Sequence, residues 1–163
     1  MKRELTVLEL KCKAEAYCSA VERCESEVEA KLDQWGASSE DKARIMTHLC
    51  QERYLDTRRF CEAFVRDKYR FNQWGRVKIA QALRLKKLPA EAIAEGLEAI
   101  DEAEYRSLLV DLLRQKRKGI KARSDYERDG KLMRFALGRG FEMDIVRSCL
   151  KQAGGSDEMD AWD

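Results

Sequence analysis

Basic side chains gather in two stretches of this 163-residue sequence. Residues 66–88 hold eight basic side chains and one acidic side chain, and residues 114–151 hold twelve and five. Residues 89–113, which lie between them, hold one basic and seven acidic side chains, so the formal net charge of +2 hides a strong alternation. A cation cluster with so few acids favours a partner of opposite sign, such as nucleic acid or an acidic protein surface.

Two groups of cations are therefore candidate binding residues. The first basic block lies in residues 66–88, interleaved with Tyr69, Phe71 and Trp74, and the second lies in residues 114–134. The candidate contacts are Arg66, Lys68, Arg70, Arg76, Lys78 and Arg84 in the first block and Lys116, Arg117, Lys118, Lys121 and Arg123 in the second. The other basic members are Lys86, Lys87, Arg114, Arg128, Lys131 and Arg134. Because charges on a helix also commonly form a solvated face, each single position keeps both interpretations.

The residue types that usually carry catalysis form no recognisable site. The six cysteines make no CxxC pair of the kind that zinc sites use, and His48 is the single histidine. His48 and Cys50 lie two residues apart on an expected helix and so point to different sides, which disfavours a thiolate nucleophile with an adjacent base. Gly138-Arg-Gly140 follows no strand and is not a phosphate loop. We expect no enzyme, no cofactor and no metal site, with most thiols reduced and buried in the core.

Helical spacing of apolar residues predicts an all-α protein. The apolar share is 44% and there is a single proline, Pro89, while strand-like alternation is nearly absent. Ser26 with Glu29, Asp101 with Glu104, and Ser124 with Glu127 have the spacing of capping boxes. The expected helices are near 8–23, 26–35, 39–53, 57–71, 74–87, 89–99, 101–118, 124–138 and 142–152. No apolar run approaches the roughly 20 residues of a membrane span and the start does not resemble a signal peptide, so we expect a cytoplasmic protein without a membrane partner.

One helical pattern occurs three times. An apolar residue lies four places before a second apolar residue, and a third follows five places later across a short turn. The second positions are Leu32, Leu83 and Ala136, which gives a period of about 50 residues, enough for three helices. The pattern predicts tandem three-helix repeats that stack into an elongated, curved array of either hand. We place the first repeat, with an N-terminal extension, at 1–55, the second at 56–100 and the third at 101–153, followed by an acidic, disordered tail at 154–163.

The middle of the chain resembles the RecX family. The similar residues are Tyr54-Leu55-Asp56, Arg59-Phe60-Cys61, Phe64-Val65-Arg66-Asp67-Lys68, Trp74-Gly75-Arg76-Val77-Lys78-Ile79 and Leu83. The likeness extends outward over roughly residues 14–151, with Ser26 to Trp35 similar to the family's first repeat and Phe135 to Phe141 similar to its third. Thr57, Cys61 and Lys87 depart from the family pattern, in which an acidic residue, Ala and Gly are usual.

The resemblance implies a regulator of DNA repair and recombination. RecX proteins bind RecA, the bacterial recombinase of the SOS response, as it assembles on single-stranded DNA, and they usually restrain its activity. The resemblance thus implies a non-enzymatic inhibitor that contacts the RecA filament and single-stranded DNA, and duplex DNA is an additional candidate. It also implies three tandem three-helix repeats. We expect a monomer.

Two other interpretations stay open at this stage. The chain could be a helical DNA-binding or scaffold module with no RecA partner, and the RecA effect could be a modulation other than inhibition. The acidic stretch from Glu91 to Asp111 could hold a RecA subunit or pair with neighbouring basic helices, and we favour pairing. Tyr17 and Phe141 lie on apolar stripes, so we expect both in the core.

Overall fold

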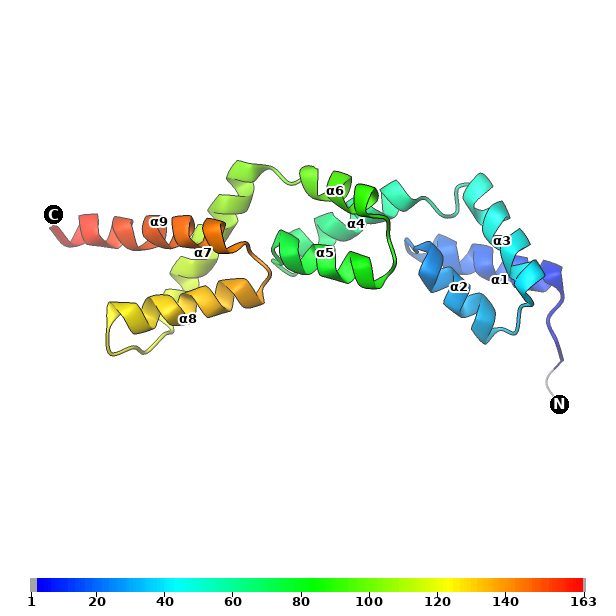
Figure 1. Cartoon of the computed structure of the whole chain (residues 1–163), viewed down its shortest axis with the longest axis horizontal. Coiled ribbons are helices and arrows are strands. Elements are labelled where there is room, and N and C mark those ends of the chain that lie inside the picture. The colour runs from blue at the N-terminus through cyan, green and yellow to red at the C-terminus, as the bar shows by residue number, and fades with distance from the viewer. Residues whose placement is uncertain (1–2, 163) are drawn as a thin grey trace. The chain divides into compact units, whose positions relative to one another are not determined.

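The computed structural model describes residues 3–162, with side chains up to residue 154, and every regular element in that range is an α-helix (Figure 1). The nine helices described are α1 (Val7–Ala20), α2 (Glu25–Gln34), α3 (Ser39–Gln51), α4 (Thr57–Arg70), α5 (Arg76–Leu85), α6 (Ala90–Glu98), α7 (Glu102–Lys118), α8 (Asp125–Gly138) and α9 (Met143–Trp162). The predicted all-α helical-repeat fold is confirmed. α9 continues as a helix beyond the expected end at 152, into the segment where we expected a disordered tail, whose state in solution stays a prediction.

Contacts divide the chain into two compact units, and the division passes through the middle repeat. The first unit comprises Met1–Phe64 and Leu83–Gly96, and the second comprises Val65–Ala82 and Leu97–Asp163. Each of the helices α4, α5 and α6 therefore contributes residues to both units. The repeat boundaries at 55 and 100 stay predictions.

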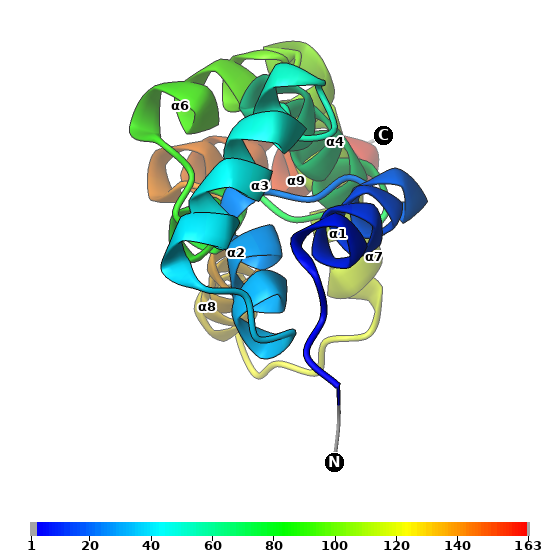
Figure 2. The same ribbon diagram turned by 90° about the vertical axis from the view of Figure 1, so that its right-hand side faces the viewer.

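The first unit is built around α1, α2 and α3, which contact one another in pairs (Figure 2). Its core is formed by Leu10, Ala14, Cys18, Val28, Leu32, Ile45, Leu49 and Leu55. Tyr17 and Trp35 cover this core, with ring centroids 6.2 Å apart in an edge-to-face arrangement. Burial of these apolar side chains is the main stabilising contribution to the unit.

Helix starts in the structure agree with two of the three predicted caps. The side chains of Asp101 and Ser124 accept the backbone N–H groups three residues later. The predicted cap at Ser26 is wrong, because α2 begins earlier: the carboxylate of Glu27 accepts the backbone N–H of Cys24 at 3.0 Å. A thiol at the cap position concealed this capping box from the sequence pattern.

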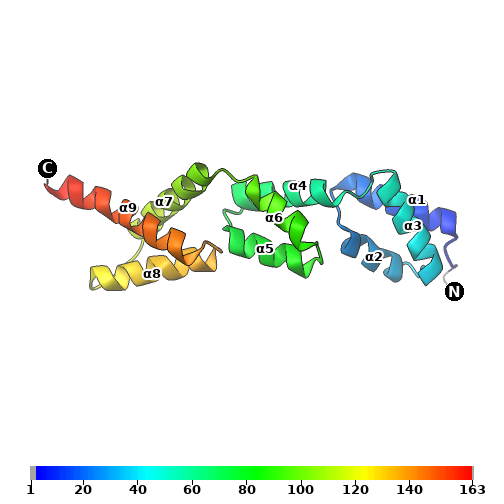
Figure 3. The ribbon, with the colours of Figure 1, turned by 45° about the horizontal axis from the view of Figure 1, so that its top comes forward.

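The second unit is built around α7, α8 and α9, which also contact one another in pairs (Figure 3). Tyr105 is fully buried at its centre, with its ring 6.2 Å from that of Tyr69 and 5.1 Å from that of Phe141. Leu109, Leu113 and Val146 are also fully buried. Phe141 is therefore a core residue, as its position on an apolar stripe predicts.

The three-fold sequence pattern corresponds to one turn that occurs after α2, α5 and α8. The backbone N–H groups of Ala37, Leu88 and Phe141 donate to the carbonyl oxygens of Leu32, Leu83 and Ala136, five residues earlier in each case. The residue before each donor has a positive φ: +86° at Gly36, +65° at Lys87 and +95° at Gly140. This is the Schellman arrangement that ends a helix.

The start of one repeated helix contacts the turn of the next repeat. In the second unit, the N–H groups of Gly75 and Val77 donate to the carbonyl oxygens of Arg139 and Gly140 at 2.7 and 2.9 Å. In the first unit, the hydroxyl of Ser26 donates to the carbonyl oxygen of Lys86 at 2.5 Å. Lys86 and Arg139 occupy the same place in the repeated turn, so the stacking contact is itself repeated.

We predict that Gly140→Ala lowers the free energy of unfolding by about 2–4 kcal/mol, because a Cβ there would lie 2.3 Å from Cβ of Lys78 and the φ of +95° is strained for alanine. Gly138→Ala is the matched control, because no atom lies within 4 Å of its Cβ position, and it should be neutral or stabilising by up to about 1 kcal/mol. Urea denaturation followed by circular dichroism measures both, and equal stabilities would contradict the close packing.

We predict that Lys87→Gly raises the free energy of unfolding by about 0.5–1 kcal/mol, because glycine adopts positive φ without the steric cost that lysine has. Lys87→Ala is the control, since it removes the same exposed side chain and keeps the strained backbone. The same urea titration compares the two variants. A glycine variant no more stable than the alanine variant would contradict this explanation.

Candidate functional site

The first basic block is divided between the two compact units. Arg84, Lys86 and Lys87 belong to the first unit, where Lys86 is 3.1 Å from the carboxylate of Glu27 and the other two are exposed. Its remaining cations, from Arg66 to Lys78, belong to the second unit. The block is therefore not one continuous feature of a single unit.

The end of α4 presents two exposed cations of this block. Arg66 and Arg70 are exposed and one helical turn apart, and Arg66 is 3.8 Å from Asp67, a surface pair of little stabilising value. Phe71 follows α4 with 82% of its surface exposed. Tyr69, by contrast, is buried. The predicted interleaving of cations and aromatic rings thus includes both core and surface rings.

Two lysines of the first block flank an indole ring. The ammonium of Lys68 lies 4.8 Å from the ring centroid of Trp74, and that of Lys78 lies 4.6 Å from it. Trp74 is half-buried. Such cation–π contacts fix the positions of both ammonium groups while leaving them charged.

Arg76 is held by a network inside the second unit. Its guanidinium is 2.9 Å from the carboxylate of Glu142, pairs with Glu102 and lies over the ring of Tyr105, 4.0 Å from the centroid. The hydroxyl of Tyr105 donates to Glu142 and accepts the backbone N–H of Arg76 at 3.0 Å. Because the Arg76 side chain is only 22% exposed, a phosphate contact would require breaking part of this network.

The electrostatics of this network favour the charged forms of Arg76 and Glu102. Burial alone lowers the pKa of Arg76, but hydrogen bonds to Glu102 and Glu142 raise it above its ordinary value. The same hydrogen bond from Arg76 lowers the pKa of Glu102. Burial and the hydrogen bond to Glu142 raise the pKa of Tyr105, so its hydroxyl stays protonated. Arg76 therefore has a structural role, in which its ion pairs join the start of α5 to Glu102 and Glu142.

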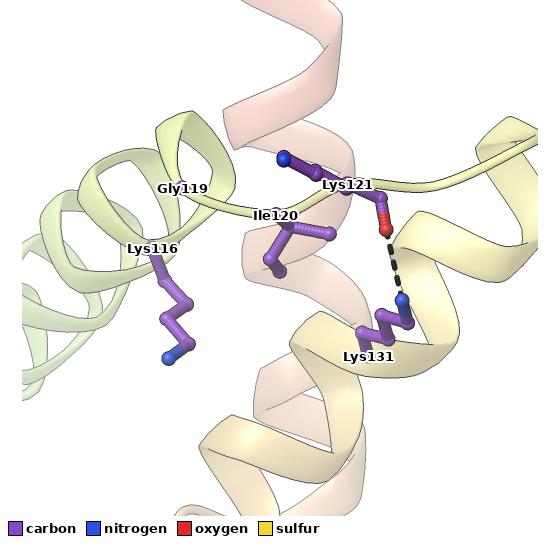
Figure 4. A pocket seen from close by; sticks show the side chains of 5 residues that line it. All are labelled: Lys116, Gly119, Ile120, Lys121 and Lys131. Atoms are coloured by element: carbon purple, nitrogen blue, oxygen red, sulfur yellow. Dashed lines mark hydrogen bonds between the residues drawn. The ribbon is translucent and has the colours of Figure 1, made fainter.

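The second basic block surrounds the loop between α7 and α8. An open pocket of about 430 Å³ in this region is lined by Lys116, Gly119, Ile120, Lys121 and Lys131 (Figure 4). Lys131 reaches from α8 toward the loop, and its Nζ donates to the carbonyl oxygen of Lys121 at 2.8 Å. This bond fastens the loop to α8.

The cations of the second basic block differ in their contacts with other side chains and with the backbone. Arg117 donates to the carbonyl oxygen of Ala153 at 3.4 Å, and Lys116 lies 5.1 Å from the ring centroid of Phe135. The side chains of Lys118, Lys121 and Arg123 are exposed and make no hydrogen bond or ion pair with another described residue. These three cations are available to a partner.

Further side chains, which the sequence interpretation did not single out, lie beside the second block. A pocket of about 560 Å³ is lined by Arg117 of α7, by Asp125, Arg128, Asp129 and Met133 of α8, and by Arg147, Leu150, Lys151 and Gly154 of α9. Arg147 and Lys151 are four residues apart, so their shared helix face was the available signal. The pocket mixes both signs of charge.

The prediction that the acidic stretch pairs with basic helices holds for one residue. Glu102 pairs with Arg76 and Arg106. On α6, however, Glu91, Glu95 and Glu98 are exposed, and no ion pair joins them to the described part of the chain. Pairing is therefore wrong as a general description of this stretch.

The groups considered for catalysis have separate partners. His48 is 2.8 Å from Glu15, whereas the thiol of Cys50 donates to Glu25. Burial raises the pKa of Cys18 and Cys61 to about 11, which keeps these thiols protonated. Across the residues described, no group of His, Cys, Asp or Glu is arranged to hold a metal ion. None of the described helices is long and apolar enough to cross a membrane.

The fold defines a class of helical-repeat protein, and exposed cations lie on α4, at the end of α7 and in the α7–α8 loop. Similarities to known proteins identify the family to which the chain belongs. The model of the RecX second three-helix domain matches residues 56–97, and that of the third matches residues 103–150. A regulatory protein RecX from Clostridium botulinum (strain Alaska E43 / Type E3) is 30% identical over 149 residues, covering 88% of this chain and 69% of that protein.

Two further similarities agree with this match. Regulatory protein RecX from Chlorobaculum tepidum is 29% identical over 140 residues, covering 83% of this chain and 85% of that protein. The crystal structure of RecX from Lactobacillus salivarius has a TM-score of 0.82 and 19% identity, covering 91% of this chain and 96% of that one, a likeness of fold. The chain belongs to the RecX family of regulatory proteins.

We predict that Arg76→Ala lowers the free energy of unfolding by about 2–3 kcal/mol, because Glu142 and Tyr105 lose a partner in a half-buried site. Arg70→Ala, which removes an exposed arginine, should change it by less than about 0.5 kcal/mol.

The ion pair of Arg76 with Glu102 also makes stability depend on pH. Because the folded pKa of Glu102 lies below its ordinary 4.5, the contribution of Glu102 to the free energy of unfolding is present above pH 4.5 and is lost as the pH falls through the lowered value. Urea titrations between pH 3 and pH 7 should show that the free energy of unfolding of Arg76→Ala depends less on acid pH than that of the unmodified protein. If Arg76→Ala is as stable as Arg70→Ala, the stabilising role of Arg76 is contradicted.

Proposed function

We propose that this protein binds the RecA filament on single-stranded DNA and restrains the recombinase and ATPase activities of RecA. The observation that carries the proposal is the match of residues 56–97 and 103–150 to the RecX domains, together with membership in that regulatory family. The protein acts by binding and carries out no chemistry of its own.

The exposed cations supply the contacts with the filament. The cations that face solvent are Lys118 at the end of α7, Lys121 and Arg123 in the α7–α8 loop, and Arg66 and Arg70 on α4. They neutralise DNA phosphates, and the release of counterions favours binding. Arg76, although a candidate from the sequence, positions the start of α5 and does not itself contact the ligand, because its guanidinium is engaged by Glu102 and Glu142. Lys78 contacts the ligand while held against Trp74.

The proposal is tested with Lys121→Glu and Arg123→Glu, singly and together, in RecA ATPase and strand-exchange assays beside anisotropy measurements on single-stranded DNA. We predict weaker DNA binding, weaker inhibition of RecA, and a salt slope smaller by about 0.7 for each phosphate that the variant no longer neutralises. Arg44→Glu is the matched control, since it reverses one exposed charge on α3 outside both blocks. The control should behave like the unmodified protein.

The outcomes separate the parts of the proposal. Unchanged binding and slope in the double variant would remove the α7–α8 loop from the interface. DNA binding without any effect of the unmodified protein on RecA would overturn the RecA partner and support the second candidate function, a helical DNA-binding module. The exposed cations without internal partners are the observation that favours this second candidate.

A further inference from the structure

Two aromatic rings are placed in solvent beside the exposed cations. Among the aromatic side chains that the structure describes, only Phe71 and Tyr126 are exposed, with 82% and 91% of their surfaces accessible. Phe71 lies in the first basic block and Tyr126 lies in the second. The coincidence of both exposed rings with the two cationic stretches requires an explanation, because ring burial is favourable and the other described rings are at least half-buried.

Neither ring belongs to a loose segment of the chain. The N–H of Phe71 donates to the carbonyl oxygen of Asp67 at 2.9 Å, and the carbonyl oxygen of Asn72 accepts the guanidinium of Arg139 at 2.9 Å. The backbone around Phe71 is thus held on both sides. A partner that binds the Phe71 ring therefore orders only its side chain, because the backbone is already held, and this lowers the entropic cost of binding.

Tyr126 is held by the start of α8. The hydroxyl of Ser124 accepts the N–H of Glu127 at 3.1 Å, and the carboxylate of Glu127 accepts the N–H of Arg123 at 3.1 Å. These bonds fix the backbone on both sides of Tyr126, and Arg123, whose side chain is exposed, lies three residues before the ring in the same short segment. Lys121 and Lys118 precede it, without a partner among the described side chains.

An exposed ring on a held backbone, with cations nearby in the chain, is the combination that binds unpaired bases. Cations contact the phosphate backbone, and an aromatic ring stacks on a base of any sequence because every base has a π-face. Bases in a duplex are already stacked on one another, so a ring of this kind selects single strands. An acidic protein surface would use the cations but would have no base to place against the rings.

We infer that Phe71 and Tyr126 are base-stacking residues, each of which binds one unpaired base of single-stranded nucleic acid while neighbouring cations bind the adjacent phosphates. The inference rests on the proposed function, since it takes single-stranded DNA to be part of the ligand. Base stacking by these two rings goes beyond the proposed function, because it explains how the protein distinguishes single-stranded DNA from duplex DNA and from an acidic protein.

The test compares oligo(dT) with an oligonucleotide of the same length whose sugars carry no bases, by fluorescence anisotropy with purified protein. The two oligonucleotides carry the same phosphates, so the difference in affinity isolates the bases. The unmodified protein should bind oligo(dT) at least about tenfold more tightly. Phe71→Ala and Tyr126→Ala should each weaken oligo(dT) binding by roughly 5- to 100-fold, leave binding to the abasic oligonucleotide unchanged, and keep the salt slope.

Three variants control for other causes. Tyr126→Phe and Phe71→Tyr keep a ring and should bind oligo(dT) like the unmodified protein. Leu85→Ala removes an apolar side chain that is 85% exposed and lies between Arg84 and Lys86, but it removes no ring, so it should have no effect. All substituted side chains lie in solvent, so folding is preserved.

The failures of the two proposals are distinguishable. Equal affinities of the unmodified protein for oligo(dT) and the abasic oligonucleotide would overturn base stacking while leaving RecA inhibition intact. Alanine variants that lose RecA inhibition but keep oligo(dT) affinity would assign the rings to a protein contact and also overturn it. Normal base-dependent binding without any effect on RecA would sustain base stacking and overturn the RecA part of the proposed function.

Discussion

The structure of the second unit depends on the close approach of Gly75 to the turn at Gly140. A Cβ on Gly75 would lie 2.4 Å from backbone atoms of Gly140 and Phe141, so only glycine permits the two hydrogen bonds that join the start of α5 to this turn. The same approach places the guanidinium of Arg76 against Glu142 and the ring of Tyr105. Backbone hydrogen bonds, the ion pairs and the buried aromatic core of the unit thus share one geometric requirement.

This requirement separates the cations into two kinds. Arg76 adjoins Gly75 and is drawn into the interior contacts of the unit, where its charge is neutralised by Glu102 and Glu142. Cations on helix ends and loops away from the turn, such as Arg70 and Lys121, remain in solvent. Under the proposed function, the second kind supplies the binding energy toward DNA, because a cation with a fixed internal partner gains little from exchanging that partner for a phosphate.

The sequence predicted the fold closely because helix periodicity and the repeated turn are local features. Leu32, Leu83 and Ala136 were aligned by spacing alone, and each accepts the same hydrogen bond. The site was less predictable. Composition placed Arg76 and Arg123 in equivalent blocks, but their roles differ through contacts with residues such as Glu142, 66 positions away from Arg76, which no local pattern contains. The cap at Cys24 was missed because thiols are rarely expected there.

The repeat also relates the start of α8 to the starts of α2 and α5. The repeat spacing makes Arg128 the counterpart of Gly75 and Cys24, which lie where α5 and α2 meet the turn of the next repeat. Among the described residues, no backbone hydrogen bond joins such a turn to the start of α8, where the half-buried side chain of Arg128 pairs with Asp125 at 3.0 Å. The side chains of Ser124, Asp125 and Tyr126 at this helix start are exposed. Tyr126 and Arg123 therefore lie at a helix start whose counterparts in α2 and α5 contact a turn, whereas in α8 both side chains are exposed.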